Sequence, residues 1–315
     1  MELRNIKSFI KVAEFENFSK AAETLGYAQS TITTQIQLLE DELGVSLFDR
    51  IGKKVFLSEK GRQFLAYANS MAKLEEEALE TISNTETPSG ILQIGIIESI
   101  VFSTAEPILE EFLLKCPAVT LKVKIGTNLE LLNLLEKGLL DAVLLLDSPI
   151  FRPELENIFT ADTQIFFFCA PEHPFAGKNI SPEQLKTETF LLTEQNCNYR
   201  DSFDKLMEKH AVPINYCIEC GITSYIIDFV AKGMGISFLP DYCLATALRE
   251  NKIRTFTVEG CNIQMKVQLL RHKQKWSSLA ERRFFEIAGR HLSADCMDST
   301  HKEHFRNMVG NRMMQ

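Results

Sequence analysis

The sequence predicts an α+β protein with several domains: a small helical N-terminal domain, one long helix, and a large α/β region. Apolar residues recur at helical spacing through the first 43 residues, and a longer helical stripe follows over about 64–82. Beyond residue 90, short β-branched runs alternate with helical stretches. A length of 315 residues is enough for two or more such domains.

Composition excludes several classes of protein. With 45% hydrophobic and 24% charged residues, the chain has the make-up of packed domains and not of a disordered segment. Its apolar runs are far shorter than the ~18–20 residues that cross a bilayer, and its start, MELRNIKSFI, has no apolar leader core. We therefore expect a cytoplasmic protein without a membrane partner, whose eight cysteines are reduced and mostly buried.

The net charge of −8 is unevenly distributed. Residues 1–65 carry nine Lys or Arg and nine Asp or Glu, so the remaining 250 residues hold the whole excess. No charged residue occurs from Gly26 to Leu39, whereas residues 50–62 carry five cations and one anion, a local balance of +4. An uncharged polar segment followed by a basic one is compatible with a polyanionic partner despite the acidic mean.

The first 43 residues predict three helices with a tight turn between the second and third. We expect the second helix to begin at Phe18 with Ser19 as a hydroxyl cap, and to end at Gly26, which supplies a left-handed residue. On the third helix, a buried stripe of Ile32, Ile36, Leu39 and Leu43 leaves hydroxyls and amides on the opposite face. This pattern is typical of a helix-turn-helix.

Such side chains offer donors and acceptors to base edges, and glutamine can pair bidentately with adenine. Residues 47–57 predict a hairpin with cations near its tip, a wing able to reach phosphate or the minor groove. The residues expected to contact double-stranded DNA are Gln29, Ser30, Thr33, Thr34 and Gln37 from the helix, with Arg50 and Lys53 from the wing.

A long amphipathic helix is predicted to begin at Ser58-Glu59. Its apolar stripe runs from Phe64 to Ile82 and has no evident partner within its own small domain. We expect the same helix of a second chain to cover this stripe. Such pairing would place two helix-turn-helix domains about a two-fold axis. Residues 84–90 then interrupt the helix and read as a hinge.

The alternation beyond the hinge predicts parallel sheets covered by helices, arranged as two subdomains. Crevices at the carboxyl ends of such strands favour small polar or anionic ligands, because helix starts present free N–H groups there. Three strand-to-helix turns meet that description, namely Glu98-Ser99-Ile100, Gly126-Thr127-Asn128 and Gly221-Ile222-Thr223.

Many spaced residues agree at once with one known family. The run Ala21-Ala22-x-x-Leu25, Gln29, Thr33, Gln35-Ile36, Leu39-Glu40, Leu43-Gly44, Leu47-Phe48-x-Arg50 and Leu57-Ser58-x-x-Gly61 resembles the winged helix-turn-helix of LysR-type transcriptional regulators. Ala28 and Thr34 depart from that pattern, which usually has a hydroxyl and a basic residue there.

The resemblance implies a DNA-binding regulator, not an enzyme, with no cofactor and no metal. It implies a winged helix-turn-helix at 1–60, a linker helix and hinge at 61–87, a periplasmic-binding-protein-like effector domain (type 2) at 88–295, and a tail at 296–315. The effector domain divides into subdomains of about 88–162 with 267–295, and 163–266. A small-molecule effector, RNA polymerase and further copies of the chain, as homodimer or homotetramer, are the implied partners. The implied effector site consists of Ser99, Ile100, Thr127, Asn128, Thr193, Arg200 and Thr223.

Two other interpretations stay open at this point. The chain could be a solute-binding or enzymatic α/β protein whose N-terminal helices serve for assembly, although no motif for a nucleophile, metal or phosphate loop stands out. A thiol-redox variant of the regulator is the second. Against it, Cys217 and Cys220 are three residues apart in a segment that looks extended, where their side chains point to opposite faces.

Overall fold

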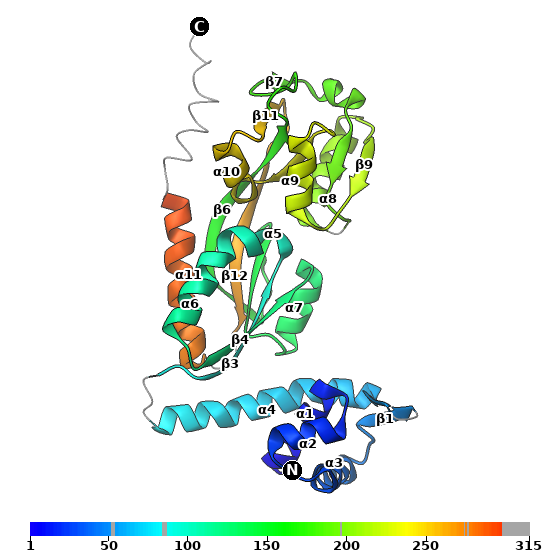
Figure 1. Cartoon of the computed structure of the whole chain (residues 1–315), viewed down its shortest axis with the longest axis vertical. Coiled ribbons are helices and arrows are strands. Elements are labelled where there is room, and N and C mark those ends of the chain that lie inside the picture. The colour runs from blue at the N-terminus through cyan, green and yellow to red at the C-terminus, as the bar shows by residue number, and fades with distance from the viewer. Residues whose placement is uncertain (52–53, 84–86, 196, 274, 276, 298–315) are drawn as a thin grey trace.

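The computed structural model of the chain describes residues 1–51, 54–83, 87–195, 197–273, 275 and 277–297. The N-terminal domain and one long helix lie at one end of the molecule, and two α/β lobes extend away from them (Figure 1). No helix within the described ranges is long and apolar enough to span a bilayer.

The N-terminal domain packs three helices against a two-stranded hairpin. Its elements are α1 (Leu3–Phe15), α2 (Phe18–Leu25), α3 (Gln29–Leu43), β1 (Phe48–Ile51) and β2 (Lys54–Leu57). Phe9 is fully buried at the centre, where its ring lies 5.3 Å from that of Phe48 and 5.2 Å from that of Phe64. The predicted helix-turn-helix with a wing is therefore confirmed.

The long helix α4 (Glu59–Ser83) is only partly without a partner. Phe64, Leu65, Ala68 and Met71 pack into the core of the N-terminal domain, so the expectation that the whole stripe lacks a local partner was wrong. The distal half differs, since Leu74 is 65% exposed and Ile82 is 83% exposed. The first turns thus belong to the domain core, and the later turns carry the uncovered apolar face.

The first lobe contains β3 (Gly90–Ile96), α5 (Glu98–Ile100), a π-helical turn (Val101–Ala105), α6 (Glu106–Lys115), β4 (Val119–Ile125), α7 (Asn128–Glu136) and β5 (Ala142–Asp147). Strand β3 lies between β4 and β5, parallel to both. The C-terminal helix α11 (Leu279–Met297) packs beside α6, where Phe112 and Phe284 stack edge to face with ring centroids 5.5 Å apart. Helix α11 includes the first two residues of the expected tail, and residues 298–315 lie outside the described ranges.

The second lobe contains β7 (Asn179–Ile180), a 3₁₀ helix (Pro182–Thr187), β8 (Phe190–Leu192), α8 (Asn198–Lys209), β9 (Tyr216–Glu219), α9 (Thr223–Ala231), β10 (Ser237–Pro240), α10 (Asp241–Arg249) and β11 (Arg254–Val258). The strands β6 (Leu155–Cys169) and β12 (Ile263–His272) run through both lobes and join them (Figure 1).

The prediction of purely parallel sheets was wrong, because the central sheet is mixed. Its order is β4-β3-β5-β12-β6-β11-β7, with β10 also paired to β6. Strand β12 is antiparallel to both β5 and β6, and β6 is antiparallel to β10 and β11. Two long antiparallel strands, β6 and β12, connect the lobes without a helical crossover. Alternation of strands with helices along the sequence predicts crossovers between parallel strands, so it did not reveal the antiparallel direction of these two.

Candidate functional site

The face of α3 that was expected to contact DNA is exposed. Gln29, Ser30, Thr33, Thr34 and Gln37 are all exposed, while Ile32, Ile36 and Leu39 on the opposite face are at most 3% exposed. The Ser8 hydroxyl on α1 also donates to the side-chain oxygen of the buried Gln35 at 2.5 Å, which fixes the rotation of α3 about its axis. The surface that α3 presents outward from Gln29 to Gln37 thus consists of hydroxyls and amides, and the Asp41 carboxylate lies one helical turn beyond it.

The caps of the helix-turn-helix differ from the expectation. The cap of α2 is Asn17, whose side chain accepts a hydrogen bond from the Lys20 amide at 3.1 Å, and not Ser19. Ser19 donates instead to the side-chain oxygen of Gln29, at 2.9 Å. Helix α3 begins after Ala28 with no side-chain cap, so its first amide groups remain available to an anion such as a phosphate.

A carboxylate on α3 forms hydrogen bonds with the start of the wing. Glu40 accepts hydrogen bonds from the backbone amides of Leu47 at 2.6 Å and Phe48 at 3.3 Å. Arg50 lies in β1 opposite Val55. Its side chain, and the whole of Lys53, lie outside the described part of the structure.

A second polar site lies at the seam between the two lobes. The Glu98 carboxylate accepts from the Thr223 amide at 3.1 Å and from the Thr223 hydroxyl at 3.3 Å, so it sits on the first turn of α9. The hydroxyls of Ser99 and Tyr242 are 3.2 Å apart. Asn128 from the first lobe and Asn198 from the second both donate to the Leu146 carbonyl, at 2.8 and 3.4 Å. Side chains that are distant in sequence therefore meet at the boundary between the two lobes.

Arg200 does not reach into this seam as a free cation. Its guanidinium donates to the Asp204 carboxylate at 2.9 Å and to the Thr193 carbonyl at 2.6 Å, and lies 3.5 Å from Glu219. The side chain is only 5% exposed. Its charge is compensated within the second lobe by Asp204 and Glu219, so the geometry gives no support to Arg200 as an effector-binding residue.

The other expected effector residues occupy varied positions. Thr127 caps α7 by accepting from the Glu130 amide at 3.3 Å, which is an ordinary structural role. Ile100 and Thr193 are buried, at 0% and 4% exposure. Ser99, Asn128 and Thr223 are the members of the predicted set that make the seam contacts described above.

Burial favours the neutral form of two thiols and one phenol, those of Cys197, Cys243 and Tyr242. It raises the pKa of the Cys197 thiol to about 11 and raises the pKa values of Cys243 and Tyr242 well above their usual ranges. A reactive cysteine needs a lowered pKa, because the thiolate is the nucleophile. These two thiols therefore lack the electrostatic setting of a redox sensor.

Among the cysteines that the structure describes, burial is more varied than expected. Cys116 and Cys169 are buried, four are partly buried, and Cys217 is exposed.

Three seam residues were missed in the selection from sequence. Glu98 was noted only as a neighbour of Ser99, and Tyr242 and Cys243 lie on α10, a helix that was not predicted. The Cys243 thiol approaches the Ser99 carbonyl at 3.4 Å. The signal was present, because Pro240-Asp241 ends a buried strand and opens a helix, the same strand-to-helix turn that identified the other three positions.

Comparisons with known proteins identify the family of the chain. The family model for the bacterial regulatory helix-turn-helix proteins of the LysR family matches residues 3–62, and the LysR substrate binding domain matches residues 85–293. The chain belongs to the LysR family. It is a DNA-binding transcriptional regulator with an effector-binding domain, and not an enzyme.

LysR-family relatives match along nearly the whole chain. The uncharacterized HTH-type transcriptional regulator YwqM of Bacillus subtilis (strain 168) is 32% identical over 289 residues, 91% of this chain and 98% of that protein. A full-length OxyR variant from Pseudomonas aeruginosa has a TM-score of 0.73 at 22% identity, covering 93% of this chain and 94% of its own. CbnR complexed with its target DNA has a TM-score of 0.61 at 22% identity, covering 92% and 100%. At these identities the structural likeness shows the fold.

Replacing Glu98 by glutamine is expected to raise the melting temperature of this LysR-family protein at pH 7. Burial is the main cause that raises the pKa of Glu98, with a smaller contribution from Glu194, so the ionised carboxylate is disfavoured in the folded state. The contribution of Glu98 to the free energy of unfolding is fully present below its pKa in the unfolded chain. It is lost as the pH rises through the higher pKa that Glu98 has in the folded protein. A glutamine oxygen still accepts from Thr223 without that loss, so the advantage should grow from pH 4 to pH 8 in thermal melts.

The matched control is Glu250→Gln, at the residue that directly follows α10. A hydrogen bond from Lys252 lowers the pKa of Glu250, so this change should cost stability above pH 5 or leave it unchanged. A Glu98→Gln protein that melts below wild type at pH 7 would show that the carboxylate's bonds to Thr223 outweigh the cost of its burial.

Proposed function

We propose that α3 lies in the DNA major groove and contacts bases and phosphates through Gln29, Ser30, Thr33, Thr34 and Gln37, while the wing grips the backbone through Arg50 and Lys53. The observation that carries this is the exposed face of hydroxyls and amides from Gln29 to Gln37 on α3, which begins at a helix start without a side-chain cap. Because this reading needs access to DNA, we place the protein in the cytoplasm.

We further propose that two chains pair through the distal half of α4, where Leu74, Leu79 and Ile82 are more than 60% exposed. Pairing would bury this apolar face and present two α3 helices to a dyad-symmetric site. Association of dimers into a homotetramer and contact with RNA polymerase complete the proposed regulator.

The proposed effector is a small polar molecule that binds at the seam beside Ser99, Asn128 and Thr223. Binding there would change the angle between the lobes and so alter the DNA-bound assembly. If the effector is an anion, it takes its hydrogen bonds from hydroxyls, amides and helix starts, because Arg200 is already paired within its own lobe.

Footprinting on the DNA upstream of the protein's own gene, at two salt concentrations, tests the DNA-binding proposal. A long protected region centred on a dyad, weaker at the higher salt, is expected. The solute-binding interpretation would instead give no protection there or on genomic fragments at low salt.

Replacing Arg50 by alanine should weaken binding of that DNA and flatten its salt dependence. One lost phosphate contact reduces the slope of log K against log salt by about 1 and lowers affinity for all sequences nearly equally. Fluorescence anisotropy between 50 and 200 mM salt measures both effects. A variant with weaker binding but the wild-type slope would contradict the phosphate contact.

A further inference from the structure

Each glutamine on the exposed face of α3 has one end of its amide engaged by the protein. The Gln37 amide nitrogen donates to the Asp41 carboxylate at 2.9 Å, one helical turn later. Since an ionised carboxylate can only accept, the Gln37 oxygen is left pointing away from Asp41. The Gln29 oxygen accepts from the Ser19 hydroxyl at 2.9 Å, which leaves the Gln29 amide nitrogen as the free end. The two amides therefore have opposite polarity.

Ser19 is available for this contact because it does not cap α2. Asn17 performs that role, and Ser19 lies exposed in the first turn facing the start of α3. The bond joins the two helices of the helix-turn-helix across the tight turn at Gly26. Initiation of α2 therefore does not depend on the hydrogen bond between Ser19 and Gln29.

The threonines between the two glutamines also have fixed polarity. The hydroxyls of Thr33 and Thr34 donate to the carbonyls of Gln29 and Ser30, each at 3.0 Å. Their hydroxyl hydrogens are directed into the helix, so each side chain offers an acceptor lone pair and a methyl group to the outside. Hydrogen-bond donors are thus concentrated at the start of the face and acceptors beyond it.

We propose that Ser19 and Asp41 are positioning residues that set base preference, by holding Gln29 as a donor and Gln37 as an acceptor. This inference rests on the proposed contact between α3 and DNA. Gln29 then selects a base with a major-groove acceptor at its reach, which cytosine lacks, and Gln37 selects one with an amino group, adenine or cytosine.

The experiment measures affinities of the full chain for the protected duplex and for every single base-pair variant of one half-site. Gln29→Ala and Gln37→Ala identify the base pair that each glutamine discriminates, with an expected effect of about fivefold at that pair. Ser19→Ala should lose the discrimination at the Gln29 pair alone, and the Ser19→Ala, Gln29→Ala double variant should be no worse than Gln29→Ala. Ser19→Thr keeps the hydroxyl and should retain the discrimination.

Asp41 is tested with two variants, because it is also a negative charge close to the expected DNA. Asp41→Asn removes the charge and introduces an amide that can donate to Gln37 as well as accept from it, so overall affinity should rise while the base preference is lost. Asp41→Ala removes the acceptor and should allow adenine and guanine equally at the Gln37 pair. The salt slope of the serine variants should stay that of wild type, since no phosphate contact is changed.

Additive effects of Ser19→Ala and Gln29→Ala, or equal losses for Ser19→Ala and Ser19→Thr, would overturn the role of Ser19. A wild-type base preference at the Gln37 pair in both Asp41→Asn and Asp41→Ala would overturn that of Asp41. A wild-type chain that protects no DNA sequence would overturn the proposed function itself, and with it this inference. Discrimination by the glutamines without any effect of Ser19 or Asp41 would overturn the inference and leave the proposed function standing.

Discussion

Replacing Asp141 by alanine is expected to lower the free energy of unfolding of the α/β region by about 3–5 kcal/mol, as for other broken buried ion pairs. Asp141 is only 3% exposed, and its carboxylate lies 2.7 Å from the Lys275 ammonium, which is itself 14% exposed. The other carboxylate oxygen accepts from the Gln93 amide at 2.7 Å. The alanine variant would leave a buried ammonium without its counter-charge and a backbone donor without its acceptor.

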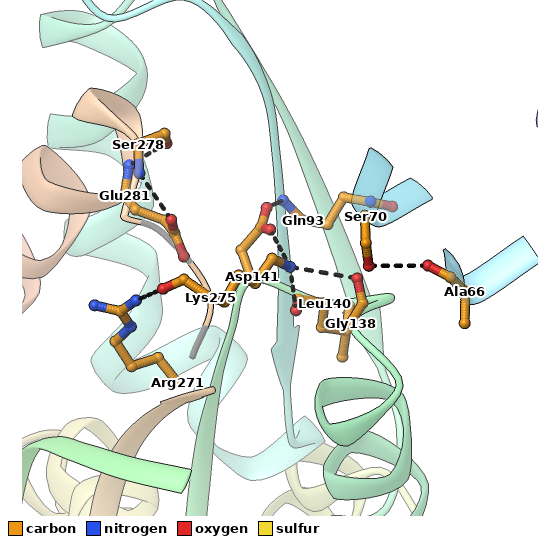
Figure 2. Close-up of polar contacts among 10 residues, drawn as sticks. All are labelled: Ala66, Ser70, Gln93, Gly138, Leu140, Asp141, Arg271, Lys275, Ser278 and Glu281. Carbon is orange, nitrogen blue, oxygen red and sulfur yellow. Dashed lines mark hydrogen bonds and ion pairs between the residues drawn. The ribbon is translucent and has the colours of Figure 1, made fainter. Parts of the chain in front are cut away.

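The environment of Lys275 explains why it cannot simply turn to solvent. Its ammonium also donates to the carbonyls of Leu140 at 2.9 Å and Gly138 at 3.3 Å, so it holds the turn that precedes β5 (Figure 2). That turn faces α4, because a Cβ at Gly138 would come within 3.3 Å of the Ser70 hydroxyl. The ion pair therefore supports the place where the effector domain meets the linker helix.

Thermal and urea unfolding of the Asp141→Ala protein measure this effect. The matched control is Lys124→Ala, which breaks a pair with Glu130 at 3.0 Å whose side chains are 51% and 46% exposed. Exposed pairs contribute about 0–1 kcal/mol, so this variant should unfold almost as wild type does. Equal losses for the two variants would show that burial does not make the Asp141 pair special.

Replacing Gly61 by alanine should destabilise the N-terminal domain and weaken DNA binding more than tenfold. A Cβ at this position would lie 2.0 Å from the Leu47 carbonyl oxygen and 3.0 Å from a Leu57 methyl. Overpacking of a close contact typically costs about 1–3 kcal/mol, and here the obstacle is backbone that cannot rotate away. The first turn of α4 and the start of the wing would have to separate.

This contact is part of a compact junction. The Ser58 hydroxyl accepts from the Gly61 amide at 2.9 Å and donates to the Ser46 carbonyl at 2.7 Å, and the Ser58 amide donates to the Leu47 carbonyl at 3.0 Å. Displacing Gly61 would break these bonds and shift the wing relative to α3. DNA affinity by anisotropy and unfolding by circular dichroism should therefore change together.

Gly289→Ala in α11 is the control, because a Cβ there meets no atom within 4 Å. Alanine in a helix interior is about 1 kcal/mol more favourable than glycine, so this variant should be slightly more stable than wild type, with unchanged DNA affinity. A Gly61→Ala protein that binds DNA as tightly as wild type would show that the junction can rearrange at little cost.

The sequence by itself was sufficient for the family, the helix-turn-helix and most of the secondary structure, because these depend on local periodicity and on spaced motifs. The turns Gly126-Thr127-Asn128 and Gly221-Ile222-Thr223 were predicted to lead into helices, and α7 and α9 begin at Asn128 and Thr223. The outward face of α3 followed from the spacing of Ile32, Ile36 and Leu39, since helical geometry fixes which side chains oppose a buried stripe.

Only the tertiary structure decided which partners the polar groups take. Arg200 looked available beside a helix start, but Asp204, Glu219 and the Thr193 carbonyl compensate its charge. Ser19 looked like a cap, but Asn17 holds that position and Ser19 turns to Gln29. The directions of the strands in the central sheet and the pairing of Glu98 with Thr223 could not be predicted from the sequence for the same reason. A hydrogen bond or ion pair needs two groups at one place, and residues 125 positions apart meet only through the path of the folded chain.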